Sequence, residues 1–166
     1  MDGVNLKKTD KRTAGQKHGD LRTALLSEGL VLLDNEGIES VTIRAVARNA
    51  GVAHSAPANH FPSRNTMLTA IAAMIFAELA EMSVAAVTAM DDQPEQAIRT
   101  FADTWFQFAF DHPNRYQLLW QRQLVSHEDP GLEREMNRVY STLLSILQRN
   151  QMDRRVDAET DDVVEA

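Results

Sequence analysis

Apolar residues recur at three- and four-residue intervals along most of the chain, which is the spacing of one buried helix face. The first such segment covers residues 21–34. Asp20 is placed to cap its start, and Gly37 is placed to end it, because glycine readily takes the left-handed conformation that follows many helices. The pattern therefore predicts a helix over residues 21–34.

Two short helices are predicted next. Thr42 is a good N-cap for a helix over residues 43–49, and Gly51 suits a tight turn because it tolerates positive φ. The segment that follows, residues 53–61, can form only about two helical turns, because Pro62 cannot continue a helix.

The rest of the chain predicts longer helices. Ser63 caps a segment whose apolar positions continue to Met82. Three further segments begin near Pro94, Pro113 and Pro130, at the first-turn position that proline favours. Strand patterns and internal repeats are absent from the sequence. The chain is therefore predicted to be all-α.

Composition excludes several classes of chemistry. The 166 residues include no cysteine, which rules out disulfides, cysteine-based metal sites and a thiol nucleophile. The longest apolar run, residues 70–77, is far shorter than the roughly 20 residues that span a bilayer. No apolar segment follows the basic N-terminus, as it would in a secretory signal. We expect a soluble, cytoplasmic protein without cofactor or metal.

The formal net charge of −7 hides an asymmetry, because residues 1–70 carry a net charge of +2 and residues 71–166 carry −9. Basic side chains gather at the start, at Lys7, Lys8, Lys11, Arg12, Lys17 and Arg22. Residues 1–19 lack helical periodicity, so we predict a flexible basic arm. Such an arm is typical of a polyanion-binding end, although a solvated tail that binds nothing has the same composition.

Two short helices joined by a glycine-containing turn form a helix-turn-helix when they pack on a preceding helix, and the second of them can enter the major groove of DNA. Any tight corner between two helices gives a similar pattern. The residues themselves add to it: TIRAVARNAGV at residues 42–52, followed by HFPSR at residues 60–64, resembles the helix-turn-helix of TetR-type transcriptional regulators.

The resemblance extends over residues 20–75 and implies a three-helix DNA-binding head, a connecting helix and an α-helical body that binds an effector and dimerises. We therefore divide the chain into a basic arm (1–19), a helix-turn-helix domain (20–66), a regulatory body (67–152) and an acidic tail or incomplete helix (153–166). The implied partners are double-stranded operator DNA, a small hydrophobic effector and a second copy of the chain. Repression is the commoner outcome in such regulators.

The resemblance also suggests DNA contacts, at Arg22, Thr42, Arg44, His54, Ser55, Asn59, His60 and Arg64. Thr42 matches a cap that touches a phosphate, and Arg64 stands where a lysine commonly contacts the backbone. Asn59 can pair with adenine through two hydrogen bonds. The same residues also have ordinary roles open to them, as helix caps or surface side chains.

The sequence departs from the family pattern at two positions. Ala53 replaces the usual Ser or Thr cap before the recognition helix, and Ala58 replaces an aromatic residue that commonly contacts phosphate. The recognition segment itself holds no Lys or Arg. We therefore expect affinity to depend on Arg22, Arg44, Arg64 and the helix ends, and to fall with rising salt.

Aromatic and methionine side chains concentrate in the body. They either form plain core or line the effector cavity that the resemblance implies; the candidates are Met74, Met82, Trp105, Phe108, Tyr116, Trp120, Met136 and Tyr140. An enzyme is disfavoured, because His112 and the group His127, Glu128 and Asp129 lack a metal-binding spacing and no nucleophile or phosphate-loop motif is present. The alternative that stays open is an α-helical ligand-binding or adaptor protein with weakened DNA binding.

The C-terminal end makes the homodimer uncertain on sequence grounds. The last helix is predicted to end near residues 148–152, and residues 153–166 contain six acidic residues. Residues 161–164 resemble the opening turn of a further helix. A shortened body and a weakened dimer are therefore both compatible with the sequence.

Overall fold

The all-α prediction is confirmed. The computed structural model describes residues 14–89 and 93–164, and within these ranges it contains helices and no strands. The elements are α1 (Ala14–Glu36), η1 (Ile38–Ser40), α2 (Ile43–Asn49), η2 (Ala56–Asn59), α3 (Arg64–Thr88), α4 (Pro94–Asp111), α5 (Pro113–Leu119) and α6 (Pro130–Val164), where η marks a short 3-10 helix. The predicted helix starts at the three prolines are correct.

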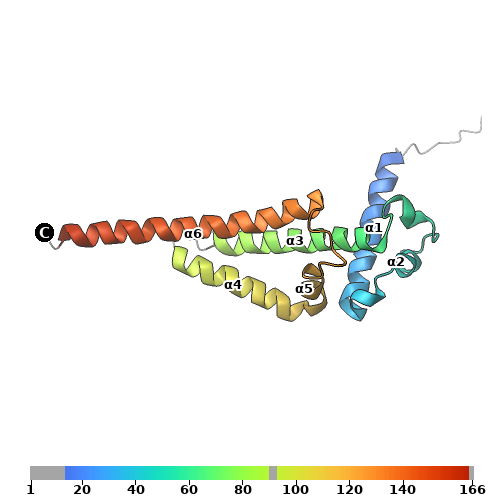
Figure 1. The fold of residues 1–166 in the computed structure, drawn as a ribbon, viewed down its shortest axis with the longest axis horizontal. Helices are drawn as coiled ribbons and strands as arrows, with labels where there is room; N and C mark the ends of the chain where they lie inside the picture. The colour runs from blue at the N-terminus through green and yellow to red at the C-terminus, as the bar shows by residue number, and fades with distance from the viewer. Residues whose placement is uncertain (1–13, 90–92, 165–166) are drawn as a thin grey trace, which may run out of the picture.

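The elements form two parts (Figure 1). In the head, which comprises α1 to η2, α1 crosses the start of α3, and α2 and η2 lie at the outer end of the molecule. In the body, which comprises α3 to α6, the long helices α3, α4 and α6 run side by side, and α5 lies next to α1. α6 continues past the ends of its neighbours, away from the head.

Local sequence rules account for the shape of the head. Gly37 has a φ of 83° and ends α1, and Gly51 has a φ of 66° in the turn after α2; both conformations favour glycine. Thr42 and Ser63 cap α2 and α3, because the hydroxyl oxygen of each accepts a 3.1 Å hydrogen bond from the N–H three residues on. These four predictions are confirmed.

Two predicted helix boundaries are wrong. α1 begins at Ala14, so Asp20 lies inside a helix rather than at its cap, and only residues 1–13 of the predicted arm lie outside the described residues. α6 continues to Val164, beyond the end predicted near residues 148–152. Apolar periodicity predicts only the part of a helix that has an apolar face. Helix propensity can extend the helix beyond that part, so the pattern misplaces its ends. Residues 153–164 therefore continue α6 rather than form a separate acidic tail.

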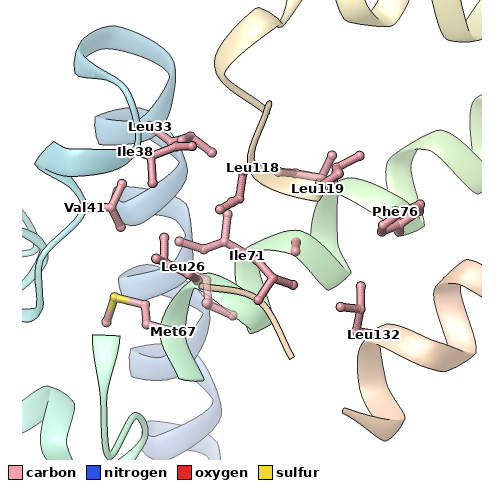
Figure 2. Close-up of a cluster of buried hydrophobic side chains, with 14 of the residues drawn as sticks. Leu26, Leu33, Ile38, Val41, Met67, Ile71, Phe76, Leu118, Leu119 and Leu132 are labelled. Carbon is pink, nitrogen blue, oxygen red and sulfur yellow. The ribbon is translucent and has the colours of Figure 1, made fainter. Parts of the chain in front are cut away.

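One apolar core joins the head to the body (Figure 2). Leu26 and Leu33 from α1, Ile71 from α3 and Leu118 from α5 lie together in it and are all buried. Gly29 lets α1 approach α3 closely, because a Cβ atom at this position would lie 2.7 Å from the Cδ1 atom of Ile71. The two parts are thus packed as one unit.

α3 is the central helix of this unit. It contacts α1, α4, α5 and α6. Among the described residues it is the one helix whose length and composition would also suit a membrane span. Its contacts with four other helices account for the apolar composition.

Candidate DNA-binding face and ligand pocket

The turn after α2 presents polar side chains to solvent. The predicted helix over residues 53–61 is reduced to the single 3-10 turn Ala56–Asn59. Two residues explain the difference, because Ala53 offers no capping oxygen and Pro57 has no N–H to donate. Pro57 is buried and anchors the turn, whereas the exposed side chains include those of His54, Ser55 and Asn59.

α2 combines a capped start with exposed positive charge. The Thr42 hydroxyl oxygen accepts a hydrogen bond from the Ala45 N–H, and the side chains of Arg44 and Arg48 are exposed. α2 contacts both α1 and η2. This order of a supporting helix, a short helix, a glycine turn and an exposed turn is that of a helix-turn-helix whose second helix is short.

Arg64 holds the head together. Its Nε donates a 2.8 Å hydrogen bond to the Val41 carbonyl oxygen, and its Nη2 donates one of 2.6 Å to the Ile38 carbonyl oxygen. The same Nη2 lies 3.5 Å from a Glu39 carboxylate oxygen. A lysine could not make these two fork-shaped bonds to carbonyls. The predicted phosphate contact thus falls on a side chain that already ties α3 to the α1–α2 connection.

Arg22 and His60 lie around the buried ring of Phe61. The guanidinium carbon of Arg22 lies 5.3 Å from the centre of that ring, within the range of a cation–π contact. The His60 and Phe61 ring centres are 6.4 Å apart. Both residues line a hollow of about 290 Å³ that reaches the start of α6. These two predicted DNA contacts therefore lie at the junction of head and body.

The body contains a larger pocket of about 590 Å³ between α3, α4, α5 and α6. Phe76 of α3 and Phe101 and Trp105 of α4 form one part of its wall. The α5 end and the following connection contribute Leu119, Trp120, Arg122 and His127. α6 contributes Met136, Asn137, Val139, Tyr140 and Leu143. The wall is therefore mostly apolar, with a few polar groups, as is typical of sites for small molecules.

Ring contacts and hydrogen bonds fix this wall. The Trp105 ring centre lies 6.4 Å from that of Phe76 and 6.1 Å from that of Phe101. The Trp105 indole N–H donates a 3.3 Å hydrogen bond to the buried hydroxyl of Ser83. The Nε2 atom of His127 lies 3.1 Å from the Leu119 carbonyl oxygen, which can only accept, so Nε2 carries the proton.

Comparison with known proteins identifies the head. Residues 25–71 match the profile of "Bacterial regulatory proteins, tetR family". Residues 25–71 of this chain are therefore a TetR-type segment by similarity. The matched residues include α2, η2 and the second half of α1, and the match supports a TetR-like DNA-binding regulator. A search of curated proteins gives no significant match.

Solved structures share the fold beyond the TetR-type head. A Rhodococcus sp. RHA1 protein of unknown function superposes with a TM-score of 0.71 at 24% identity, over 85% of this chain and 73% of that one. A TetR family transcription regulator from Marinobacter aquaeolei VT8 superposes with a TM-score of 0.61 at 16% identity, over 83% of this chain and 72% of that one. The helical body thus recurs in structures that include a TetR regulator.

The pocket behind the TetR-type head contains half of the predicted lining residues. Trp105, Trp120, Met136 and Tyr140 line it. The other four lie elsewhere: Met74 lines the smaller hollow, Met82 is exposed, Phe108 is buried in the core, and Tyr116 packs on the core with its ring centre 5.9 Å from that of Trp120. Helical spacing marks apolar faces, but it does not tell a filled core from an open pocket.

The polar lining residues were missed by sequence reasoning. Arg122 and His127 lie in the connection between α5 and α6, which has no periodicity to mark it. Asn137 lies on α6 among charged neighbours and carries no motif of its own. Position in the fold alone brings these three side chains to the pocket.

α5 connects the pocket region to the TetR-type head through Arg115. Its guanidinium makes two hydrogen bonds to the Asp34 carboxylate, of 2.8 and 2.7 Å, and a third of 2.8 Å to Glu78. These bonds, with the one to Asp34 the largest cause, raise the pKa of Arg115 above its usual value. Asn114 also donates a 3.1 Å hydrogen bond to the Asp34 carbonyl oxygen.

The connection between α5 and α6 is in turn bonded to the start of α3. The Asn65 side-chain N–H donates a 3.2 Å hydrogen bond to the Gln123 carbonyl oxygen, and the Ser126 N–H donates one of 3.1 Å to the Thr69 hydroxyl. The segment that carries Arg122 and His127 is therefore held on the first turns of α3, next to the head.

No group of three or more His, Asp or Glu side chains that could hold a metal ion occurs among the residues with described positions. His112 caps α5 by position and its ring contacts that of Phe108 in a tilted arrangement, with ring centres 5.1 Å apart. Asp129 caps α6 through hydrogen bonds from the Gly131 and Leu132 N–H groups. His112, His127 and Asp129, which were considered for metal chemistry, thus have structural partners.

Proposed function

We propose that this chain is a DNA-binding transcriptional regulator, a repressor that leaves its operator when a small apolar effector enters the pocket. The observation that carries the proposal is the TetR-type head, in which α2 and the exposed η2 follow one another within the matched residues 25–71. A bacterial regulator of this kind acts on DNA in the cytoplasm, which is where we expect the protein.

We assign the reading of base edges to the exposed side chains of the η2 turn, and the phosphate contacts to α2. His54, Ser55 and Asn59 are free of core packing, and Asn59 can bond adenine through two hydrogen bonds. Thr42 and Arg44 lie at the start of α2, where the Arg44 side chain is exposed. Because the η2 turn has no Lys or Arg, most of the affinity has to come from these phosphate contacts and the basic N-terminus.

A mobility-shift experiment with a DNA fragment from the chain's own upstream region tests this assignment. Asn59→Ala should weaken binding about tenfold on the cognate fragment and leave non-cognate DNA unchanged. Arg44→Ala should weaken binding to all DNA and lower the salt slope by about one. Arg99→Ala, an exposed arginine on α4, is the matched control and should change neither. Absence of any shift at low salt would contradict the proposal.

Arg64 is a poor probe of DNA binding, although it was among the predicted contacts. Its guanidinium bonds two carbonyl oxygens of the α1–α2 connection, so Arg64→Ala should first loosen the head. The loss of DNA binding in this variant should therefore accompany a loss of thermal stability. In Arg44→Ala the melting temperature should stay unchanged.

Release by an effector requires a connection between the pocket and the head, and α5 with its following connection supplies one. Leu119 and Arg122 line the pocket, while Arg115 bonds Asp34 of α1. A ligand that moves the α5 end therefore biases the position of α1 relative to α3, which is a population shift between two arrangements of the head. Arg115→Met should uncouple the two sites: an effector should still bind and no longer release DNA.

A transcriptional reporter driven by the upstream fragment tests repression. Expression should be low with the intact chain and high with the Asn59→Ala variant. The opposite result, higher expression with the intact chain, would make the protein an activator and would leave its DNA binding unaffected.

We also propose a two-fold dimer, because two recognition turns are needed to read a palindromic operator. Tyr140, Leu144 and Leu147 recur at helical spacing on α6 and are exposed, which gives this helix an apolar stripe. Sedimentation of the full chain should give a dimer, and Leu144→Glu with Leu147→Glu should give a monomer. A wild-type monomer at high concentration would contradict the dimer.

One observation favours the alternative of a ligand-binding or adaptor protein with weakened DNA binding. The η2 turn is shorter than a full recognition helix and carries no cation. In that case the pocket would bind its ligand normally while the mobility shift stayed absent even at low salt.

A further inference from the structure

We propose that the pocket between α3, α4 and α6 takes an apolar carboxylate, whose carboxylate group binds at Arg122. This inference rests on the proposed ligand-controlled regulator and names the chemical class of its ligand. The juxtaposition that carries it is an arginine that forms no ion pair with any described residue, at an aromatic and aliphatic pocket that no acidic side chain lines.

The charge of the pocket differs from that of the body around it. Residues 71–166 carry a net charge of −9, yet none of the residues that line the pocket is Asp or Glu. Arg122 gives the pocket a positive charge instead. A wall that lacks acidic groups in so acidic a body is complementary to an anion and repels a cation.

Arg122 is available to a ligand. Ion pairs hold Arg64, Arg115, Arg134 and Arg138, whereas Arg122 forms none with any residue whose position is described. Its side chain is exposed and lies two residues after Trp120, which also lines the pocket. A guanidinium presents several N–H groups in a plane and matches the two oxygens of a carboxylate.

A second polar side chain enters the pocket from the same connection. His127 donates its Nε2–H to the Leu119 carbonyl oxygen, which fixes the ring and leaves Nδ1 as its remaining polar atom. Arg122 and His127 both come from residues 120–129, whereas the apolar wall comes mainly from the helices. The ligand therefore lies with its polar group toward the α5–α6 connection and its apolar part between α4 and α6.

The size of the pocket sets the size of the ligand. A volume of about 590 Å³ lies within the range of roughly 300–1,000 Å³ that is usual for sites of drug-sized ligands. Phe76, Phe101 and Trp105 offer ring faces that favour an aliphatic or aromatic body over a polar one. A short acid such as acetate would leave most of this apolar surface uncovered.

The chain contains its own reporter for the test, because its two tryptophans, Trp105 and Trp120, both line the pocket. Tryptophan fluorescence of the full chain is measured during titration with decanoate, 1-decanol and decylamine, each below its aggregation concentration. Decanoate should bind about tenfold more tightly than 1-decanol, and decylamine should bind most weakly. The preference for decanoate should shrink as salt is added, because Arg122 is exposed to solvent.

Substitution of Arg122 separates the carboxylate contact from the apolar contacts. Arg122→Gln should lower decanoate affinity about tenfold and leave 1-decanol affinity unchanged, and Arg122→Lys should restore part of the loss. Arg99→Gln, an exposed arginine on α4 outside the pocket, should change neither affinity. Equal binding of decanoate and 1-decanol, tighter binding of decylamine, or no fluorescence change with any probe would overturn the proposal.

The outcome is distinguishable from failure of the proposed function. If decanoate binds through Arg122 and DNA is never retained, the ligand class stands and the regulator is wrong. If 1-decanol releases the chain from DNA as well as decanoate does, the regulator stands and the ligand class is wrong. If none of the three probes changes the fluorescence, the ligand class is also wrong, whatever the oligomeric state.

Discussion

The head and the body differ in how completely they bury their apolar side chains. Of the large apolar side chains that are exposed among the described residues, the head contributes only Val31. The body contributes Met82, Val84, Phe106, Phe110, Trp120, Tyr140, Leu144 and Leu147. Exposed apolar residues that gather on one part of a molecule mark a surface for contact. The head therefore leaves little apolar surface uncovered, whereas the body presents apolar side chains that other molecules can contact.

The two parts nevertheless share a core. Leu26 and Leu33 of α1 lie with Ile71 of α3 and Leu118 of α5 (Figure 2). The head and the body therefore differ in their surfaces. Because they share one apolar core, we expect them to unfold together. The following experiments test that joint behaviour, beginning with the largest expected effect.

Leu118→Ala should lower the free energy of unfolding by about 3 kcal/mol, because it leaves a cavity where α5 meets α1 and α3. Urea unfolding followed by far-UV circular dichroism reports both parts, and tryptophan fluorescence reports the body alone. The two curves should coincide. Val31→Ala, at an exposed position of α1, should cost less than about 1 kcal/mol. Separate transitions would mean that head and body fold independently.

Arg115→Met should lower the free energy of unfolding by about 2 kcal/mol, because it removes the charged hydrogen bonds to Asp34 and Glu78. The two carboxylates are partly exposed and regain water, which keeps the loss below that of a fully buried pair. Chemical denaturation measures the loss. Arg99→Met on α4 is the matched control. An equal loss of stability in that variant would mean that the bonds from Arg115 to Asp34 and Glu78 do not stabilise the fold.

Gly29→Ala should lower the free energy of unfolding by about 1 kcal/mol. The new Cβ would crowd the Ile71 side chain at 2.7 Å, which costs more than the gain of about 1 kcal/mol in helix propensity. Ala24→Gly, at an exposed position of α1, measures the propensity change alone. A more stable Gly29→Ala variant would mean that α1 and α3 can separate without loss.

Glu135→Gln should have the smallest effect, about 0.5 kcal/mol, and should act on the body alone. Arg138 donates a 2.6 Å hydrogen bond to the Glu135 carboxylate, which, with help from Arg134, lowers the pKa of Glu135. A lowered folded-state pKa stabilises the fold above the unfolded-state pKa, and this contribution is lost as the pH falls through the folded-state value. The wild type and the variant should therefore differ at neutral pH and converge in acid. A difference independent of pH would exclude the ion pair as its cause.

Features that follow from a residue and its immediate neighbours were predictable from the sequence. The caps at Thr42 and Ser63, the positive φ at Gly37 and Gly51, and the helix starts at three prolines each depend on local backbone chemistry. The TetR resemblance was carried by the same segments. Local rules thus sufficed from the end of α1 to the end of α2.

Features that depend on distant contacts were not predictable in this way. Arg64 bonds carbonyl oxygens more than twenty residues away, which a motif match to a phosphate-contacting position conceals. Phe108 and Trp105 both lie on the apolar face of α4, yet Phe108 is buried in the core and Trp105 lines the pocket. Arg122 reaches the pocket because the α5–α6 connection is hydrogen-bonded to the first turns of α3. The predicted DNA contacts themselves stay predictions until they are measured.

The way in which the η2 turn is held in the fold affects how easily its sequence can change. Its anchor to the fold is the single buried Pro57, while His54, Ser55 and Asn59 project into solvent. Exposed positions without packing partners accept substitution at little cost in stability. If these side chains read base edges as proposed, a few substitutions at them would change the DNA sequence that the chain recognises while the scaffold stays intact.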